Sequence, residues 1–484
     1  MSSEVNALSA ADPVSAPDEF TDSALPIMLR RALPGLVVAF IVIRMLQPIS
    51  DSDTFWHMVA GDWLRDTHRF VVEPDPWSST ASRPWILNQW LPELFMSWFQ
   101  EHFGLPGVAW LHVFALVGVY LTVWWVCRAR ASMLVSAIVS VAAFGAMSGS
   151  LAARPQVVSF AFAAVATGAW LKSADDLKPR WWLIAMTWVW ACSHGFWFFS
   201  PVIGLTVVAG LALDRRLDRR SGGRLLLVCL GSAVAGALTP VGPILVTSPF
   251  QVRDVTQYID EWQSVGITDP RLLVLLCLVA LAVVIGLRRG ERTPWHLILL
   301  IGLAAGLGLT YARTIAVGAA VIAPIAAGAL HEVTRLKREP RRAGPEFAIV
   351  GIIAAAALTV SAVTAPAVAA TPGLAPNGLN AQLDALPKGT VLCNAWAYGG
   401  WLIWRHPDLK VTMDGRAEIY TGDYVTSYVM FELARPGWKE YVSRAGCDYA
   451  LLQQGKPIVE ALTSEARWSK VAEADGGVLL RRPG

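Results

Sequence analysis

The chain has 484 residues, of which 54% are hydrophobic and only 16% are charged, and it contains 22 Trp. This composition excludes an ordinary soluble domain and predicts an α-helical polytopic membrane protein. The formal charge of +3 gives no reason to expect a nucleic-acid partner.

The first 25 residues are polar, acidic and poor in aromatic residues, so we expect 1–25 to be a disordered cytoplasmic tail. The apolar run that follows is too long for a cleavable signal peptide and lacks a small-residue cleavage site. It is therefore expected to act as an anchor in the membrane.

Apolar segments of roughly membrane-spanning length, about 17–25 residues each, then recur along the chain. They lie at 28–47, 106–127, 132–149, 156–172, 181–199, 201–213, 224–240, 271–287, 294–310, 313–331 and 346–366. About eleven spans are expected within a transmembrane domain over 26–370, with an error of one or two. If the spans alternate, the Arg and Lys clusters fall on the side of the N-terminus, which predicts an N-in, C-out protein.

The composition changes after Pro366. Residues 371–484 carry charge, Gly and Pro, and short strand-like runs alternate with helix-like stretches. This pattern predicts a small external soluble α/β domain after a linker over 371–378, or one that folds back onto the membrane part. The strand-like runs lie at 390–393, 410–413, 449–453 and 478–482. The domain also holds Cys393 and Cys447, and the sequence leaves undecided whether the two form a disulfide.

The first external loop, expected over 48–105, begins with the acidic motif DSDTFWH. A helix is expected over 53–66, with Ser52 or Asp53 as its N-cap. Its aromatic residues lie on one side and it is too polar to span, so we expect it to lie in the membrane interface.

On such a helix Asp53 and His57 share a face, and Asp51 can reach the same pocket. Two carboxylates beside an imidazole can deprotonate a hydroxyl group or hold a divalent cation such as Mn²⁺ or Mg²⁺. The structural alternative is an N-cap Asp with a surface His.

Five further ionisable residues of the membrane part are expected on the same external side: Glu93, Arg154, His194, Glu261 and Arg313. An ionisable residue in or near a membrane span costs free energy, and such residues usually line a cavity. Guanidinium groups bind phosphate well, which makes Arg154, Arg313 and His194 candidates for binding an anionic lipid headgroup. Each of them alone can instead be a snorkelling side chain or a helix cap. The candidate substrate-binding residues beside them are Trp90, Glu93, Glu261 and Trp262.

These pieces together resemble a known family. The segments that carry the resemblance are DSDTFWHMVAGDWL, RPWILNQWLPEL, AARPQ, SHGFW, EWQS and WAYGGWLIWRHPDLKVTMDGRAEIY. In order and topology the chain resembles the GT-C superfamily of membrane glycosyltransferases, and more narrowly a bacterial GT-C-like group of mostly unassigned function. The resemblance implies an enzyme of the bacterial plasma membrane that takes a sugar from a polyprenyl-phosphate-linked donor. It also implies that Asp51 or Asp53 acts as base or metal ligand.

The chain departs from the family in one respect, because it lacks the paired adjacent acids of some protein mannosyltransferases. The acceptor, an envelope glycan, lipid or protein, therefore does not follow from the resemblance. In the tail motif VTMDGRAEIY, the charged residues Asp414, Arg416 and Glu418 follow a strand-like run. They are expected either to bind the acceptor or dock onto the membrane cavity, or to form an ion-pair cluster that fixes the domain.

The leading hypothesis is an inverting transferase. In it, Arg154, Arg313 and His194 bind the donor phosphate, and a first-loop carboxylate removes the proton of the acceptor hydroxyl group. One alternative is a transporter or flippase for a lipid-linked or anionic solute, which would place ionisable residues near the midplane and on both sides. Another alternative is a non-catalytic scaffold that presents the external domain.

Overall fold

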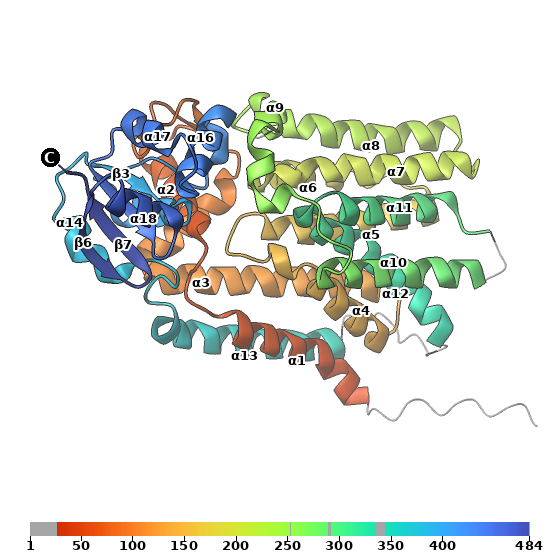
Figure 1. Ribbon diagram of the computed structural model, residues 1–484. Coiled ribbons are helices and arrows are strands. Elements are labelled where there is room, and N and C mark those ends of the chain that lie inside the picture. Colours follow the sequence, from red (N-terminus) through yellow and green to blue (C-terminus); the bar gives the residue numbers. More distant parts are fainter. Residues whose placement is uncertain (1–26, 252, 289–291, 335, 337–343, 484) are drawn as a thin grey trace, which may run out of the picture.

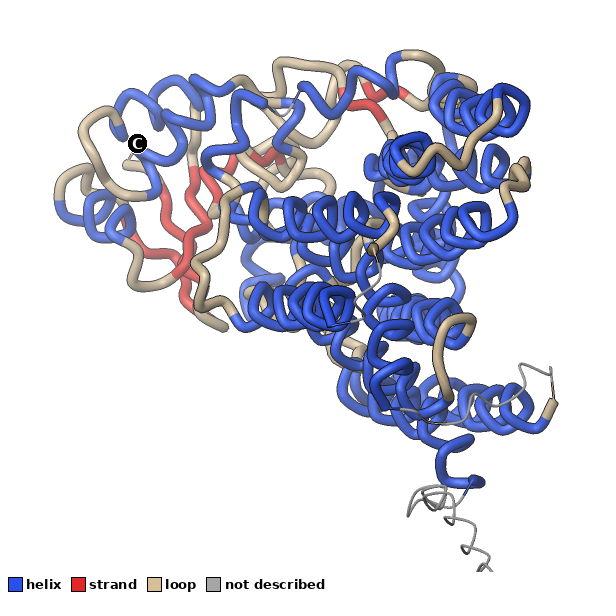
Figure 2. The backbone as a smooth tube through the Cα atoms, turned by 90° about the vertical axis from the view of Figure 1, so that its right-hand side faces the viewer, coloured by secondary structure: helices blue, strands red, loops and turns tan. Residues whose placement is uncertain are grey.

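A computed structural model describes residues 27–251, 253–288, 292–334, 336 and 344–483. The tail expected over 1–25 lies outside the described residues. Helices form the larger part of the molecule, and Figure 1 shows them as a bundle with a small sheet at one end. Figure 2 shows how few strands accompany these helices.

Each apolar range expected from the sequence coincides with a helix of the bundle. The helices are α1 (Ile27–Met45), α3 (Trp90–Arg128), α4 (Met133–Ala146), α5 (Val157–Asp176), α6 (Trp182–Ser193), α7 (Phe199–Leu213), α8 (Arg219–Ala237), α10 (Pro270–Arg288), α11 (Trp295–Thr310), α12 (Ile315–Thr334) and α13 (Pro345–Val368).

Six helical segments of the described chain are long and apolar enough to cross a membrane. They are α3, α5, α7 with the turn before it, α10, α12 with the turn before it, and α13. Three further helices, α4, α6 and α11, are apolar but shorter. Because a helix satisfies its own backbone hydrogen bonds, such segments are the form in which a chain crosses a bilayer.

Helix α3 is longer than the sequence pattern suggests. Its first part lies within the predicted loop 48–105, and it bends at Gly104, which has φ 64° and ψ −161° and stands two residues before Pro106. The positive φ is one that glycine adopts without strain. The membrane-length part of α3 follows this bend, as the span over 106–127 predicts.

The helix of the first loop, α2 (Ser52–Thr67), confirms the expected element but corrects its cap. The N-cap is Asp51, whose side chain accepts a hydrogen bond from the backbone of Asp53. A carboxylate before the first turn accepts from free N–H groups there. Every residue from Thr54 to Gly61 is buried, because α2 packs against both α3 and the C-terminal domain.

The C-terminal domain contains a mixed five-stranded sheet in the order β4-β3-β5-β7-β6. Strands β4, β3 and β5 are parallel, and the other pairs are antiparallel. The strands are β3 (Val391–Asn394), β4 (Lys410–Val411), β5 (Tyr449–Gln453), β6 (Ser469–Ala474) and β7 (Gly477–Arg481). The four predicted strands are confirmed. Strand β6 was missed because its sequence, SKVAEA, is polar and largely exposed at the sheet edge.

Short helices surround this sheet, and another group of short elements connects α8 to α10. The helices of the domain are α14 (Asn380–Asp384), α15 (Trp396–Arg405), α16 (Gly422–Glu432), α17 (Trp438–Ala445) and α18 (Pro457–Ser464), with the turns η6 (Asn377–Leu379) and η7 (Ala417–Ile419). The connecting elements are α9 (Ile244–Gln251), η3 (Arg253–Tyr258) and η4 (Asp260–Trp262).

The C-terminal domain packs onto the first loop. Ser78 pairs with Val411 as a parallel bridge, so the loop covers the free edge of β4. Gly400 of α15 donates its backbone N–H to the Ser52 hydroxyl group. Aromatic and aliphatic residues of both parts form one buried cluster. Of the two arrangements that the sequence left open, the domain therefore has the one in which it folds back.

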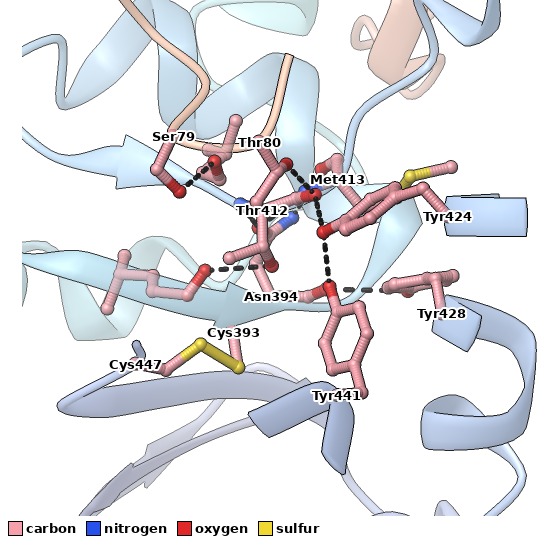
Figure 3. The surroundings of a disulfide bond; sticks show 12 residues. Ser79, Thr80, Cys393, Asn394, Thr412, Met413, Tyr424, Tyr428, Tyr441 and Cys447 are labelled. Atoms are coloured by element: carbon pink, nitrogen blue, oxygen red, sulfur yellow. Dashed lines mark hydrogen bonds between the residues drawn. A yellow bond between two sulfur atoms is a disulfide. The ribbon is translucent and has the colours of Figure 1, made fainter. Parts of the chain in front are cut away.

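A disulfide joins Cys393 at β3 to Cys447 after α17. Figure 3 shows it beside a network of Asn394, Thr412 and three tyrosines. The Asn394 amide group donates to Met413 O at 2.7 Å and accepts from Thr412 N at 2.9 Å. Cys393 is therefore the neighbour in sequence of Asn394, the residue that binds the start of the segment after β4.

Candidate functional site

A polar cavity of about 130 Å³ lies where the first loop, the end of the bundle and the C-terminal domain meet. Eight of the sequence-predicted site residues line it: Asp53, His57, Arg154, His194, Glu261, Trp262, Arg313 and Glu418. The other five do not line it: Asp51, Trp90, Glu93, Asp414 and Arg416. The cavity therefore brings together predicted residues from six distant segments of the chain.

Arg154 connects three carboxylates. Its Nε and Nη2 atoms bind the two oxygens of Asp51 at 2.6 and 3.0 Å. Its Nη1 atom lies 3.0 Å from Asp53 Oδ2 and 2.9 Å from Glu261 Oε1. The turn that carries Arg154 is held against α2, because the Thr54 hydroxyl group donates to Ala153 O. Most of the donors of this guanidinium are therefore already in use.

Asp53 is the first-loop acid that reaches the cavity. Its Oδ1 atom accepts a hydrogen bond from the indole of Trp56 at 3.0 Å. Burial raises the pKa of Asp53 to about 6; Arg154 opposes this shift, and Asp51 and Glu261 add to it. Near neutral pH the carboxylate is ionised but readily protonated.

The pair Asp51 and Asp53 does not have a donor arrangement that suits a divalent cation. Both oxygens of Asp51 bind Arg154, and this guanidinium also contacts Asp53. The positive charge between the two carboxylates is therefore that of an arginine side chain. Within the described residues, no cluster of three or more His, Cys, Asp or Glu side chains has the geometry of a metal site.

His57, which lines the cavity, forms a buried pair with Glu93, which does not. His57 Nδ1 lies 2.8 Å from Glu93 Oε1, and each side chain is only 2% exposed. Burial lowers the pKa of His57 well below its usual range, and the charge of Arg154 lowers it further. His57 is thus a neutral imidazole held by Glu93. Trp90 lies one turn before Glu93 and packs edge-on against Phe70, away from the cavity.

Arg313 is held very differently from Arg154. Its guanidinium lies 5.0 Å from the ring centre of Phe196 and 4.6 Å from that of Trp262. In the part of the chain that the structure describes, it has no hydrogen bond or ion pair, and its Nε atom is buried without a partner. A buried cation held only by aromatic faces keeps its donors free for an anionic ligand.

His194 ends α6 and caps the turn η2 (Gly195–Phe198). Its Nδ1 atom accepts a hydrogen bond from Phe196 N and also contacts the Ser159 hydroxyl group, at 3.0 Å. Trp190 in turn donates its indole N–H to Ser159. This arrangement leaves Nε2 of His194 without a hydrogen-bond partner among the described residues.

Glu418 enters the cavity from the C-terminal domain. It lies in η7, in the segment after β4, and among the described residues no other residue forms a hydrogen bond or an ion pair with its carboxylate, which contacts only its own backbone N–H. Burial raises the pKa of Glu418 to about 7, and the charges of Asp414 and Asp53 contribute to this shift.

Asp414 and Arg416 lie beside this segment but form a structural network. Arg416 is fully buried, and it binds both oxygens of Asp414 and, at 2.6 Å, Asp75 of the first loop. Its guanidinium also lies over the ring of Trp85. Of the two roles that the sequence left open for this motif, these contacts are those of an ion-pair cluster that fixes the domain.

An apolar groove of about 370 Å³ lies between α3 and α5 and reaches Arg154. Arg154 therefore lines both the groove and the polar cavity. His112 of α3 also lines the groove, and its Nε2 atom is buried without a partner.

Sequence reasoning missed His112, although an ionisable residue inside an apolar run is a usable signal. It also missed Gln89 and Gln156, which line the polar cavity. Their neutral side chains carry no such signal.

No protein-family model matches this chain, and no curated protein is similar enough to count as a relative.

Proposed function

We propose that the protein is a membrane glycosyltransferase of the GT-C type, which transfers a sugar from a polyprenyl-phosphate-linked donor to an envelope acceptor. The observation that carries this proposal is the continuity of two sites. An apolar groove and a polar, charged cavity meet at Arg154. A substrate with a long apolar chain and a polar, anionic head requires this combination.

In this proposal the isoprenoid chain lies in the groove between α3 and α5. The phosphate binds Arg313, whose donors are free, while Arg154 forms the wall between groove and cavity. The bond between the sugar and the phosphate breaks as the acceptor hydroxyl group attacks from the opposite side. A carboxylate of the cavity removes the proton, and the cation stabilises the charge on the departing phosphate.

The proposed orientation is N-in and C-out, with about eleven spans in the bacterial plasma membrane. The Arg-rich connection between α7 and α8 lies at the end of the bundle remote from the C-terminal domain (Figure 1). Basic connections favour the cytoplasmic side. The disulfide of the C-terminal domain is also typical of an oxidising external compartment.

The test is transfer by the purified protein in liposomes, with a panel of polyprenyl-phosphate sugars as donors. We expect Asp53→Asn, Asp51→Asn and Arg313→Gln to transfer less sugar than the wild type, and Arg313→Gln also to bind undecaprenyl phosphate more weakly. Arg288→Gln, an exposed residue at the end of α10, is the control. Full activity in Asp51→Asn, Asp53→Asn and His57→Ala would remove the proposed site.

A further inference from the structure

We propose that Glu418, supplied by the C-terminal domain, is the carboxylate that takes the proton from the acceptor. This inference rests on the proposed function, and it assigns the step to a residue other than Asp51 and Asp53.

The first argument comes from the contacts of the carboxylates that line the cavity. Asp53 and Glu261 both bind Arg154, and Asp53 also accepts from Trp56. Among the described residues, Glu418 is the cavity carboxylate that no other residue binds through an ion pair or a hydrogen bond, since its one such contact is with its own backbone N–H. A general base needs a free lone pair within reach of the proton that it removes. Glu418 meets this requirement without breaking a contact to another residue.

The second argument is that the same cavity holds an unpaired cation. Within the described part of the chain, Arg313 has aromatic neighbours but forms no ion pair, neither with Glu418 nor with another carboxylate. In the proposed transfer, negative charge develops on the departing phosphate while the acceptor hydroxyl group loses its proton. Arg313 can bind the phosphate, and the carboxylate of Glu418 can take the proton.

The step balances in atoms and charge. The oxygen of the acceptor hydroxyl group forms a bond to the anomeric carbon, and its proton moves to the carboxylate of Glu418. The bond between the anomeric carbon and the phosphate oxygen breaks, and the phosphate leaves with the electron pair and binds Arg313. Glu418 then returns the proton to water.

The surroundings of Glu418 keep its position fixed. Arg416, two residues earlier, joins Asp414 to Asp75 of the first loop. Gly415 packs directly against Asp53. The segment that carries Glu418 is thus attached to the membrane part, and the cavity is incomplete without the C-terminal domain.

The experiment compares Glu418→Gln, Asp53→Asn and the control Glu440→Gln, an exposed residue of α17. Each variant is reconstituted in liposomes, and its transfer rate and its affinity for undecaprenyl phosphate are measured separately. We expect Glu418→Gln to bind the lipid as the wild type does and to transfer about 10² to 10⁴ times more slowly, which is the usual value of general-base catalysis. The transfer rate of Asp53→Asn should fall by a smaller factor, and that of Glu440→Gln should equal the wild-type rate.

Two outcomes would overturn the inference, and they are distinguishable. If Glu418→Gln transfers at the wild-type rate while the wild type is active, the base is another group and the proposed function stands. If the wild type transfers no sugar from any donor in the panel, the proposed function fails and the inference fails with it. A melting temperature of Glu418→Gln that is no lower than that of the wild type excludes misfolding as the cause of a loss.

Discussion

Gly415 lies so close to Asp53 that a Cβ atom at position 415 would overlap the Oδ1 atom of that carboxylate. One residue belongs to the C-terminal domain and the other to the first loop. The absence of a side chain therefore allows two distant segments to close one cavity. A similar approach occurs at Gly400, where a Cβ atom would overlap the backbone oxygen of Ser52.

Adding a methyl group at either glycine should weaken the contact between the C-terminal domain and the first loop. We expect Gly415→Ala and Gly400→Ala each to lose about 1–3 kcal/mol of stability, the usual cost of overpacking. Gly266→Ala is the control, because its new Cβ would meet only ordinary contacts. Thermal unfolding in detergent measures the effect. Melting temperatures equal to that of the control would contradict the close approach.

The pH dependence of stability should change when Glu418 is replaced. Its pKa is raised to about 7 in the folded protein, so the folded state keeps a proton that the unfolded chain releases above about 4.5. Glu418 therefore becomes increasingly unfavourable for folding as the pH rises from about 4.5 to about 7.

Glu418→Gln removes this penalty. The melting temperature of the variant should therefore rise relative to that of the wild type as the pH is raised from 5 to 8. The measurement is a series of melting curves across this range, with Glu440→Gln alongside. A difference between variant and wild type that does not change with pH would show that Glu418 has an ordinary pKa.

Loss of the disulfide should destabilise the C-terminal domain. The bond joins residues 54 positions apart, and removal of such a cross-link typically costs about 2–5 kcal/mol. We expect Cys393→Ser with Cys447→Ser to unfold at a lower temperature and to transfer sugar more slowly, because Cys393 is the neighbour of Asn394, which binds the start of the segment that leads to Glu418. Cys277→Ser, which removes an exposed free thiol, is the control. Equal melting temperatures would contradict the prediction.

The orientation in the membrane can be tested with single cysteines. In a background without Cys277, Leu374→Cys should react with an impermeant maleimide in intact cells, because Leu374 is 73% exposed beside the C-terminal domain. Arg219→Cys, at the start of α8 beside the Arg-rich connection from α7, should react only after the cells are opened. The reverse pattern would place the cavity in the cytoplasm.

The sequence by itself determined the elements of this protein. The apolar runs predicted the positions of the bundle helices, because length and hydropathy are local properties of a chain. The helix of the first loop and four of the five strands of the C-terminal sheet followed in the same way from local patterns. Strand β6 did not, because it is polar and lies at the sheet edge.

Only the tertiary structure decided what each charged residue does. The sequence treated Arg154 and Arg313 alike, whereas the fold surrounds Arg154 with three carboxylates and Arg313 with two aromatic rings. It likewise buried Arg416 in an ion-pair network and left the carboxylate of Glu418 without an ion-pair partner among the described residues. These differences arise from side chains that lie far apart in the sequence. A local pattern carries no information about such partners, and the energy of a charge in a cavity depends on them.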